Sequence, residues 1–426
     1  MKPHRSSRVS RRRQSELRER AHWPEQVIGG KYVKQLQGYV DGLRESDPHG
    51  NRKLFLDDVF VTYLLAFFNP TLRSLRTIAD FSQSRQAQRH LSTTKICRST
   101  LSDFNRLVDP ERLTPILAAL RPHVAAQRAA SSGDGPLAEL LAQTVAVDGT
   151  FLPALAETTW AVRSLHQTDS TRFRARLDAQ LSVSDGLPEA IVVPEPGQGE
   201  SAAAALRVVP GKLYLYDRGF NGFELISAHY EPDQTPRARF VIRYRQAGSN
   251  APELDEVETL PLADEDCAAG VVSDRIGRFR STRAGAPTMR LRETIIETSV
   301  RGQPQRLRLI SNLVEGVSAA TIGLLYRQRW QVELFFRWLK CFGNFQHLLS
   351  ATRPGVQAQF YVVVIAAMLM YLQTGGRPSK YLFSLMSLVA GGATLQEIMP
   401  ILQERERQCE LARRSAAQRR AHAKQR

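Results

Sequence analysis

A succession of short apolar runs between residues 144 and 244 constrains the fold more than any other feature of the sequence. The runs are rich in β-branched and aromatic residues, which is typical of strands, and Asp185 and Gly186 separate two of them as a hairpin turn. Two further segments have helical spacing. The predicted order is three strands, a helix, a strand, a helix and a strand, at residues 144–152, 177–184, 187–193, 200–208, 213–219, 222–230 and 240–244.

This order is typical of an α/β protein with an RNase H-like core. Residues 246–305 then hold short β-prone pieces separated by Gly, Pro and charged residues, which predicts a β-rich insertion. Residues 307–313 resume the apolar pattern, and residues 318–342 have the spacing of one long amphipathic helix. We therefore expect an RNase H-like catalytic core that a β-rich insertion interrupts and that N-terminal and C-terminal helical regions flank.

The formal charge of +16 indicates a polyanionic partner, and nucleic acid is the class that fits best. Much of this charge lies at the two ends of the chain. Residues 1–20 hold eight Lys or Arg and two Glu, and residues 405–426 hold the same numbers. Such blocks are typical of solvated arms that do not form a hydrophobic core. A flexible basic arm can also bind the phosphates of nucleic acid without sequence specificity.

Other classes of protein are disfavoured. The four cysteines lie far apart without a CxxC pair, so we expect neither a zinc site nor a disulfide framework, and a reducing cytoplasm fits. The Arg-rich start has no apolar run behind it and does not suit a secretory signal. The most apolar stretch, residues 361–372, is too short to cross a bilayer. We therefore expect a cytoplasmic protein without a membrane partner.

The changes of pattern also predict segment boundaries. Residues 24–130 have helical spacing, and short helices at residues 71–82 and 99–107 suit either a helix-turn-helix or an ordinary helical bundle. The predicted segments are a basic arm (1–23), a helical DNA-binding domain (24–136), the first part of the core (137–245), the β-rich insertion (246–305), the second part of the core (306–350), a C-terminal helical region (351–404) and a basic tail (405–426).

Three carboxylates are candidates for catalysis. Asp148 and Asp217 each end a nearly continuous apolar run, which is where a central strand of a sheet would end, and Glu333 lies within the long helix. Oxygen ligands of this kind suit Mg²⁺ or Mn²⁺, and two such ions can carry out phosphoryl transfer. An Asp-Gly pair is more often a plain turn, as we expect for Asp185.

The helix that holds Glu333 adds weight to the group. Tyr326, Arg329, Glu333 and Lys340 stand at offsets of 0, 3, 7 and 14 residues, so they share one helix face. A pair between Arg329 and Glu333, or a solvated charged face, is the alternative. The remaining aromatic and aliphatic residues, Trp330 among them, are predicted to form the packing surface.

In these residues the sequence resembles the DDE transposases of bacterial insertion sequences, specifically the insertion-sequence-four family with its YREK signature. The matching text is VAVDGTFL, LYLYDRGF, LISNL and LYRQRWQVELFFRWLK, within residues 140–345. The resemblance implies cut-and-paste transposition by nicking, hairpin formation, resolution and strand transfer. It also implies a homodimer in the synaptic complex, with transposon end repeats and target DNA as double-stranded partners in the bacterial nucleoid.

The resemblance assigns roles to the candidate residues. Asp148, Asp217 and Glu333 would be the catalytic residues and would bind two Mg²⁺ or Mn²⁺ ions. Tyr326, Arg329 and Lys340 would hold phosphates of the terminal nucleotides, which suits the fork of Arg and the point charge of Lys. An RNase H-like nuclease that does not join DNA is a second hypothesis. A DNA-binding protein derived from a transposase, without activity, is a third, and the intact triad argues against it.

One feature departs from the family pattern. Some members stack a flipped base on a Trp of the insertion, and no Trp occurs between residues 246 and 305 here. Phe279, flanked by Arg278 and Arg280, could take that place by stacking on an extruded base. A strand aromatic that packs within the insertion fits the same residue equally well.

Overall fold

The computed structural model describes residues 37–45, 54–68, 72, 74–83, 95–129, 136–153, 162–163, 173–195, 197–245, 253–280, 286–300, 303–342, 348–374 and isolated positions between 396 and 418. The chain divides into two compact units, which comprise residues 1–127 with 341–426, and residues 128–340. The basic arm, most of the basic tail and the stretch between the two short N-terminal helices therefore lie outside the described residues.

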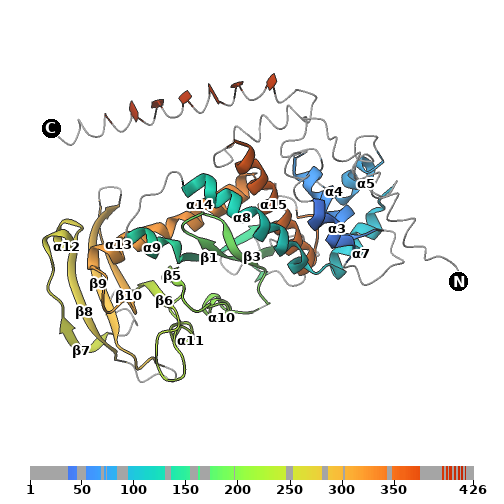
Figure 1. Ribbon diagram of the computed structural model, residues 1–426. Helices are drawn as coiled ribbons and strands as arrows, with labels where there is room; N and C mark the ends of the chain where they lie inside the picture. Colours follow the sequence, from blue (N-terminus) through green and yellow to red (C-terminus); the bar gives the residue numbers. More distant parts are fainter. Residues whose placement is uncertain are drawn as a thin grey trace. The chain divides into compact units, whose positions relative to one another are not determined.

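The first unit is helical in its described part (Figure 1). The long apolar helix α15 packs against α4, α7 and η1. Polar contacts support this packing, because the Tyr63 hydroxyl donates to Asn105 Oδ1 at 2.7 Å and the Tyr361 hydroxyl donates to Glu111 Oε1 at 2.9 Å. The elements are α3 (Gln37–Glu45), α4 (Leu56–Phe68), α5 (Leu75–Phe81), α7 (Arg98–Leu107), η1 (Pro110–Leu113), α8 (Thr114–Ala129) and α15 (Arg353–Thr374). In the described part of the chain, no helix is long and apolar enough to span a membrane.

Within residues 144–244 the second unit follows the predicted order of strands and helices, with one further short strand at Val162–Arg163. Its first part consists of α9 (Pro136–Ala142), β1 (Thr144–Pro153), β2 (Val162–Arg163), β3 (Phe173–Ser182), β4 (Pro188–Val192), α10 (Glu200–Ala205), β5 (Leu213–Tyr216), α11 (Phe223–Ser227) and β6 (Arg239–Tyr244). Its second part consists of β7 (Leu254–Thr259), α12 (Asp264–Ala268), β8 (Val271–Phe279), β9 (Leu291–Val300), β10 (Gln303–Ser311), α13 (Ala319–Gln328) and α14 (Trp330–Phe342). The mixed α/β architecture is therefore confirmed.

All strands of this unit join one mixed sheet in the order β2-β3-β1-β5-β6-β10-β9-β8-β7, with β4 paired to β3. The pairs β4–β3 and β3–β1 are antiparallel, whereas β1–β5 and β5–β6 are parallel. From β6 through β10, β9 and β8 to β7 the pairing is antiparallel. The segment predicted as an insertion thus continues the sheet that begins with β1.

The core of this unit lies where the parallel strands are buried. The four residues of β5 are all buried, as expected for a central strand that reads as a continuous apolar run. His229 is buried beside them, with its ring within hydrogen-bonding distance of the Leu225 carbonyl and the Tyr216 hydroxyl. This packing fixes β5, and with it the position of the residues that follow β5.

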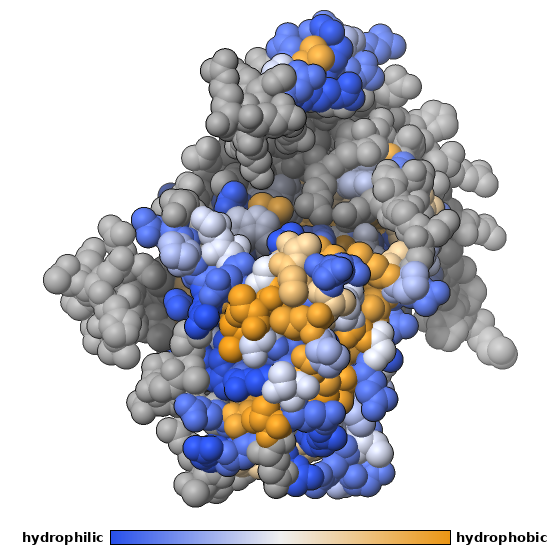
Figure 2. All heavy atoms as spheres, turned by 90° about the vertical axis from the view of Figure 1, so that its left-hand side faces the viewer, coloured by the Kyte–Doolittle hydropathy of each residue, from blue (hydrophilic) through white to orange (hydrophobic). Residues whose placement is uncertain are grey.

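The outer edge of the sheet is formed by β7 and β8. Figure 2 shows this side of the molecule, where hydrophobic surface gathers among hydrophilic residues. Val257 on β7 and Val272 on β8 are exposed. The sheet therefore ends in β7, a strand rich in acidic residues with an exposed apolar side chain, Val257.

Candidate active site

Asp148 lies within β1, not at its end. The strand continues to Pro153, and Asp148 stands opposite Ala179 of β3. The prediction that a strand ends at Asp148 is therefore wrong, because continued pairing with β3 keeps the chain extended through Gly149. The parallel pairing with β5 does end nearby, at Ala146 opposite Leu215. Asp148 thus projects just beyond the point where β1 and β5 part.

Asp217 occupies the matching place on the neighbouring strand. It follows the last residue of β5, as predicted, and its backbone carbonyl accepts the N–H of Phe220 at 3.0 Å in the turn that follows. Because β1 and β5 are adjacent and parallel, both aspartates lie at the same edge of the sheet. The Tyr326 hydroxyl of α13 donates a hydrogen bond to Asp217 Oδ1 at 3.4 Å.

Glu333 comes from a helix that differs from the predicted one. The sequence predicts one helix over residues 318–342, whereas the structure has two, α13 and α14. Arg329 stands between them. The Arg329 N–H bonds to the carbonyls of Tyr326 and Arg327 instead of continuing the regular α-helical ladder, so the helix tightens at this point. Glu333 then lies in the first turn of α14.

Arg329 joins the helix to the sheet. Its Nη1 lies 3.6 Å from Asp148 Oδ2, and its Nη2 donates to Glu333 Oε1. The helical pair that the sequence left open as an alternative is therefore present, and it includes a third partner on β1. The Arg329 guanidinium also lies over the Tyr326 ring, 5.8 Å from the ring centroid. The structure thus brings Asp148, Asp217, Tyr326, Arg329 and Glu333 into one group.

The electrostatics of Asp148 reflect this convergence. Burial raises the pKa of Asp148 to about 6, while Arg329 and the Gly149 N–H act in the opposite direction. The charges of Asp217 and Glu333 raise that pKa further, which requires both to lie close enough to repel Asp148. Burial likewise raises the pKa of Tyr326 to about 12, so its hydroxyl stays protonated at neutral pH.

The remaining predicted residues lie elsewhere. Lys340 is exposed in the last turn of α14. Phe279 is 7% exposed and packs against Tyr244 and Phe223, with ring centroids 5.4 and 6.0 Å apart. Its contacts are those of a core aromatic, and base stacking by Phe279 stays a prediction. Trp330, predicted to pack, is instead 48% exposed, and the Arg337 guanidinium lies 5.7 Å from its ring centroid.

The donor set suits a divalent metal, but its present arrangement does not form a complete metal site. Carboxylate oxygens are the ligands that Mg²⁺ and Mn²⁺ prefer, and the mutual repulsion at Asp148 is what a cation would relieve. Among the described residues, however, no three acidic, imidazole or thiol groups come together closely enough to hold an ion. Arg329 instead provides the positive charge next to Asp148 and Glu333.

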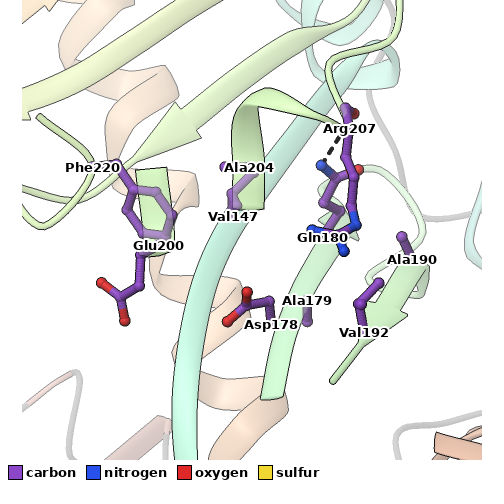
Figure 3. Close-up of a pocket in the computed structure, with 10 residues that line it drawn as sticks. All are labelled: Val147, Asp178, Ala179, Gln180, Ala190, Val192, Glu200, Ala204, Arg207 and Phe220. Atoms are coloured by element: carbon purple, nitrogen blue, oxygen red, sulfur yellow. Dashed lines mark hydrogen bonds between the residues drawn. The ribbon is translucent and has the colours of Figure 1, made fainter. Parts of the chain in front are cut away.

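A second acidic pair lies on the opposite face of β1. Asp178 of β3 stands across from Gly149, and a Cβ at Gly149 would lie 3.0 Å from both Asp178 Oδ1 and Glu200 Oε1. A Cβ at Gly219 would lie 3.1 Å from Glu200 Oε2. Both side chains line a pocket beside α10 (Figure 3). The glycines that follow the two aspartates therefore make room for Glu200. Those glycines are the only sign of the role of Glu200 that the sequence offers.

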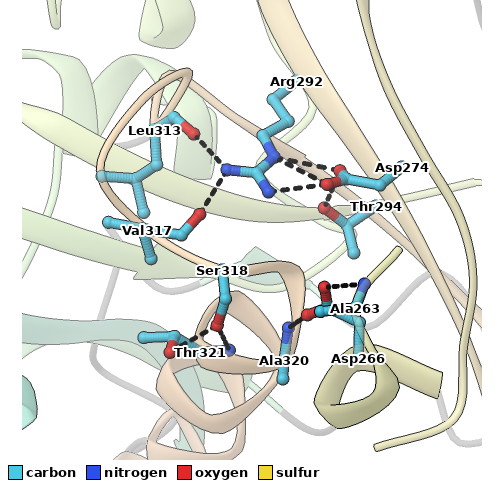
Figure 4. A network of polar contacts seen from close by, with 10 residues as sticks. All are labelled: Ala263, Asp266, Asp274, Arg292, Thr294, Leu313, Val317, Ser318, Ala320 and Thr321. Atoms are coloured by element: carbon cyan, nitrogen blue, oxygen red, sulfur yellow. Dashed lines mark hydrogen bonds and ion pairs between the residues drawn. The ribbon is translucent and has the colours of Figure 1, made fainter. Parts of the chain in front are cut away.

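A polar network anchors the start of α13 (Figure 4). Arg292 of β9 pairs with Asp274 of β8 and donates from Nη1 to the carbonyls of Leu313 at 3.0 Å and Val317 at 2.6 Å. Asp266 of α12 accepts the N–H of Ala320 at 2.8 Å. The segment from β7 to β9 thus holds the first turn of the helix pair that carries Tyr326, Arg329 and Glu333.

Comparison with known proteins gives matches of three kinds. The sequence model of the family described as Transposase DDE domain matches residues 139–369. A protein assigned as the transposase of insertion sequence element IS5377 of Geobacillus stearothermophilus is 41% identical over 64 residues, which are 15% of this chain and 17% of the relative. A protein assigned as the transposase of element IS4SA of Synechocystis is 32% identical over 71 residues, 15% of this chain and 21% of the relative. The matched stretches thus span about a fifth of these relatives.

A solved structure, the piggyBac transposase synaptic complex with hairpin DNA, aligns with a TM-score of 0.39 and 12% identity. The alignment covers 88% of this chain and 76% of that chain. This likeness is too low to support an inference about the present protein.

Proposed function

Because the match to the transposase DDE domain covers more than half of the chain, the protein belongs to that family, and we propose that it is a DNA transposase. It would catalyse cut-and-paste movement of an insertion sequence by phosphodiester hydrolysis and strand transfer. The observation that carries this proposal is the convergence at Arg329, which contacts Asp148 of β1 and Glu333 of α14 while Asp217 lies beside them. These residues come from distant parts of the chain.

The strand order supports an RNase H-like core for this activity. Antiparallel β4, β3 and β1 followed by parallel β5 and β6 is the arrangement that such a core requires, and in it Asp148 on β1 lies next to the end of β5, which Asp217 follows. Active sites of sheets of this kind form beyond the carboxyl ends of parallel strands. The core would thus present both aspartates to a helix that brings Glu333.

Asp148, Asp217 and Glu333 would hold the divalent metal. Two bound Mg²⁺ or Mn²⁺ ions supply an activated water or 3′ hydroxyl and stabilise the leaving oxygen. The protein's own part is to keep the carboxylates at one edge of the sheet and to limit the contact of Asp148 with water, since its side chain is 23% exposed. Burial of the site strengthens every charge interaction within it.

The DNA would be held by the other residues of the YREK signature. Lys340 is a cation on α14, Arg329 is a cation at the junction of α13 and α14, and Tyr326 can donate its hydroxyl to a phosphate. This pattern supports membership of the insertion-sequence-four family. A hairpin at the transposon end and a homodimer that joins two ends to one target complete the proposal.

A cleavage and joining assay tests the proposal, with duplexes that carry the DNA flanking the coding region. We expect nicking and strand transfer with Mg²⁺, and loss of both in Asp148→Asn, Asp217→Asn and Glu333→Gln. Asp185→Asn is the matched control, because Asp185 sits in the β3–β4 turn and accepts the Leu187 N–H. Nicking without joining would indicate a nuclease. Full activity in any of the three carboxylate variants would contradict the site.

A further inference from the structure

Arg329 occupies a position that a metal ion would also favour. Its guanidinium contacts Asp148 and Glu333 together, and its side chain is 10% exposed. The two carboxylate side chains are more open, at 23% and 31%. Burying a guanidinium is costly unless it has ionised partners, and the carboxylates around Arg329, Glu333 and Asp217 foremost, supply that negative charge.

The carboxylate oxygens already have protein donors. Asp148 Oδ1 accepts the Gly149 N–H at 2.8 Å, while Asp148 Oδ2 faces Arg329. Asp217 Oδ1 accepts the Tyr326 hydroxyl. A divalent ion that binds here must therefore displace groups of the protein from the oxygens it takes.

We infer that Arg329 is the internal counter-cation of the carboxylates in the DNA-free protein, and that it competes with divalent metal for Asp148 and Glu333. The inference rests on the proposed function. A DNA phosphate offers the guanidinium the same forked, anionic geometry as a carboxylate. When Arg329 moves to a phosphate, Asp148 and Glu333 become free for metal. DNA binding and metal binding then strengthen one another, since each ligand favours the form that the other needs.

The test is Mn²⁺ binding to the full-length protein without DNA, measured by electron paramagnetic resonance of free Mn²⁺ and by calorimetry. Arg329→Met removes the charge and keeps the aliphatic stem, and we expect it to bind Mn²⁺ at least about tenfold more tightly than the natural protein, a typical size for a coupling between sites. Arg329→Lys keeps the charge and should stay close to the natural protein. Arg337→Met is the matched control, because it removes an exposed charge from α14 beside Trp330.

A second measurement, thermal unfolding, tests the inference if Arg329→Met is less stable than the natural protein. In EDTA, Arg329→Met should melt at a lower temperature than the natural protein, because the carboxylates lose their counter-charge. Adding Asp148→Asn should recover part of that loss. Mn²⁺ should raise the melting temperature of Arg329→Met more than that of the natural protein, since tighter binding to the native state stabilises it more.

The outcomes separate this inference from the proposed function. A gain in Mn²⁺ affinity in Arg329→Met that disappears when Asp148→Asn or Glu333→Gln is added supports the inference. Equal affinity in Arg329→Met and the natural protein, with binding lost in the carboxylate variants, overturns the inference and leaves the metal site standing. Mn²⁺ binding that no carboxylate variant changes contradicts the proposed function and this inference together.

Discussion

Arg292 holds Asp274 with two of its nitrogens, in an ion pair whose side chains are 5% and 3% exposed. The third nitrogen of Arg292 donates to two carbonyls of the loop that enters α13. One side chain therefore neutralises a buried carboxylate and fixes the approach to the helix pair that carries the candidate site.

Replacing Arg292 should destabilise the protein strongly. In Arg292→Met the Asp274 charge stays buried without its partner, and losses of about 3 to 5 kcal/mol are typical of such a change. Urea unfolding followed by circular dichroism measures the free energy. Arg306→Met is the control, because Arg306 pairs with Glu297 on the surface, where ion pairs contribute little. Similar losses in the two variants would show that burial of the Arg292 pair is not what stabilises this region.

Asp148→Asn should stabilise the metal-free protein at high pH. Burial raises the folded pKa of Asp148 to about 6, above the ordinary value of about 4 for an aspartate, so the folded state binds more protons between these values. Its contribution to stability is therefore present below about pH 4 and is lost as the pH rises through about 6. At pH 8 in EDTA we expect the variant to gain about 1 to 3 kcal/mol, with no gain at pH 3.5. Thermal unfolding across this range measures the difference, and a gain independent of pH would contradict the raised pKa.

Gly219→Ala should reduce cleavage through Glu200. The added Cβ would lie 3.1 Å from Glu200 Oε2, closer than ordinary contact, so either Glu200 or the turn after Asp217 must shift. We expect roughly a fivefold loss of the cleavage rate, equivalent to about 1 kcal/mol in the barrier. The double variant Glu200→Ala with Gly219→Ala removes the obstacle and should recover part of the rate. Failure of the double variant to recover, with Glu200→Ala alone fully active, would show that Glu200 is not the neighbour that matters.

The order of strands and helices could be predicted because each element of this part of the chain has a clear local pattern. The buried run at β5 and the Asp-Gly turn between β3 and β4 are set by residues that are neighbours in the sequence. Asp148 shows the limit of such reasoning. Asp-Gly within β1 looks like a turn, and only pairing with β3, which is distant in the sequence, keeps it extended.

Interactions between distant segments account for the other differences. Periodicity identified the face of Tyr326, Arg329 and Glu333, but it does not show that Arg329 also reaches Asp148. The exposure of Trp330 depends on what packs against α14, which spacing does not reveal. The pairing of Arg292 with Asp274 depends on the register of β8 against β9.

The position of α14 along the chain has a consequence for synthesis. Asp148 lies on β1 and Asp217 directly follows β5, whereas Glu333 and Arg329 come later, at the end of the second unit. A nascent chain that has emerged only as far as β10 holds Asp148 and Asp217 without the glutamate and without the arginine. The complete candidate site therefore forms only after translation has passed α14, and a shorter polypeptide on the ribosome lacks part of the site on which the proposed activity depends.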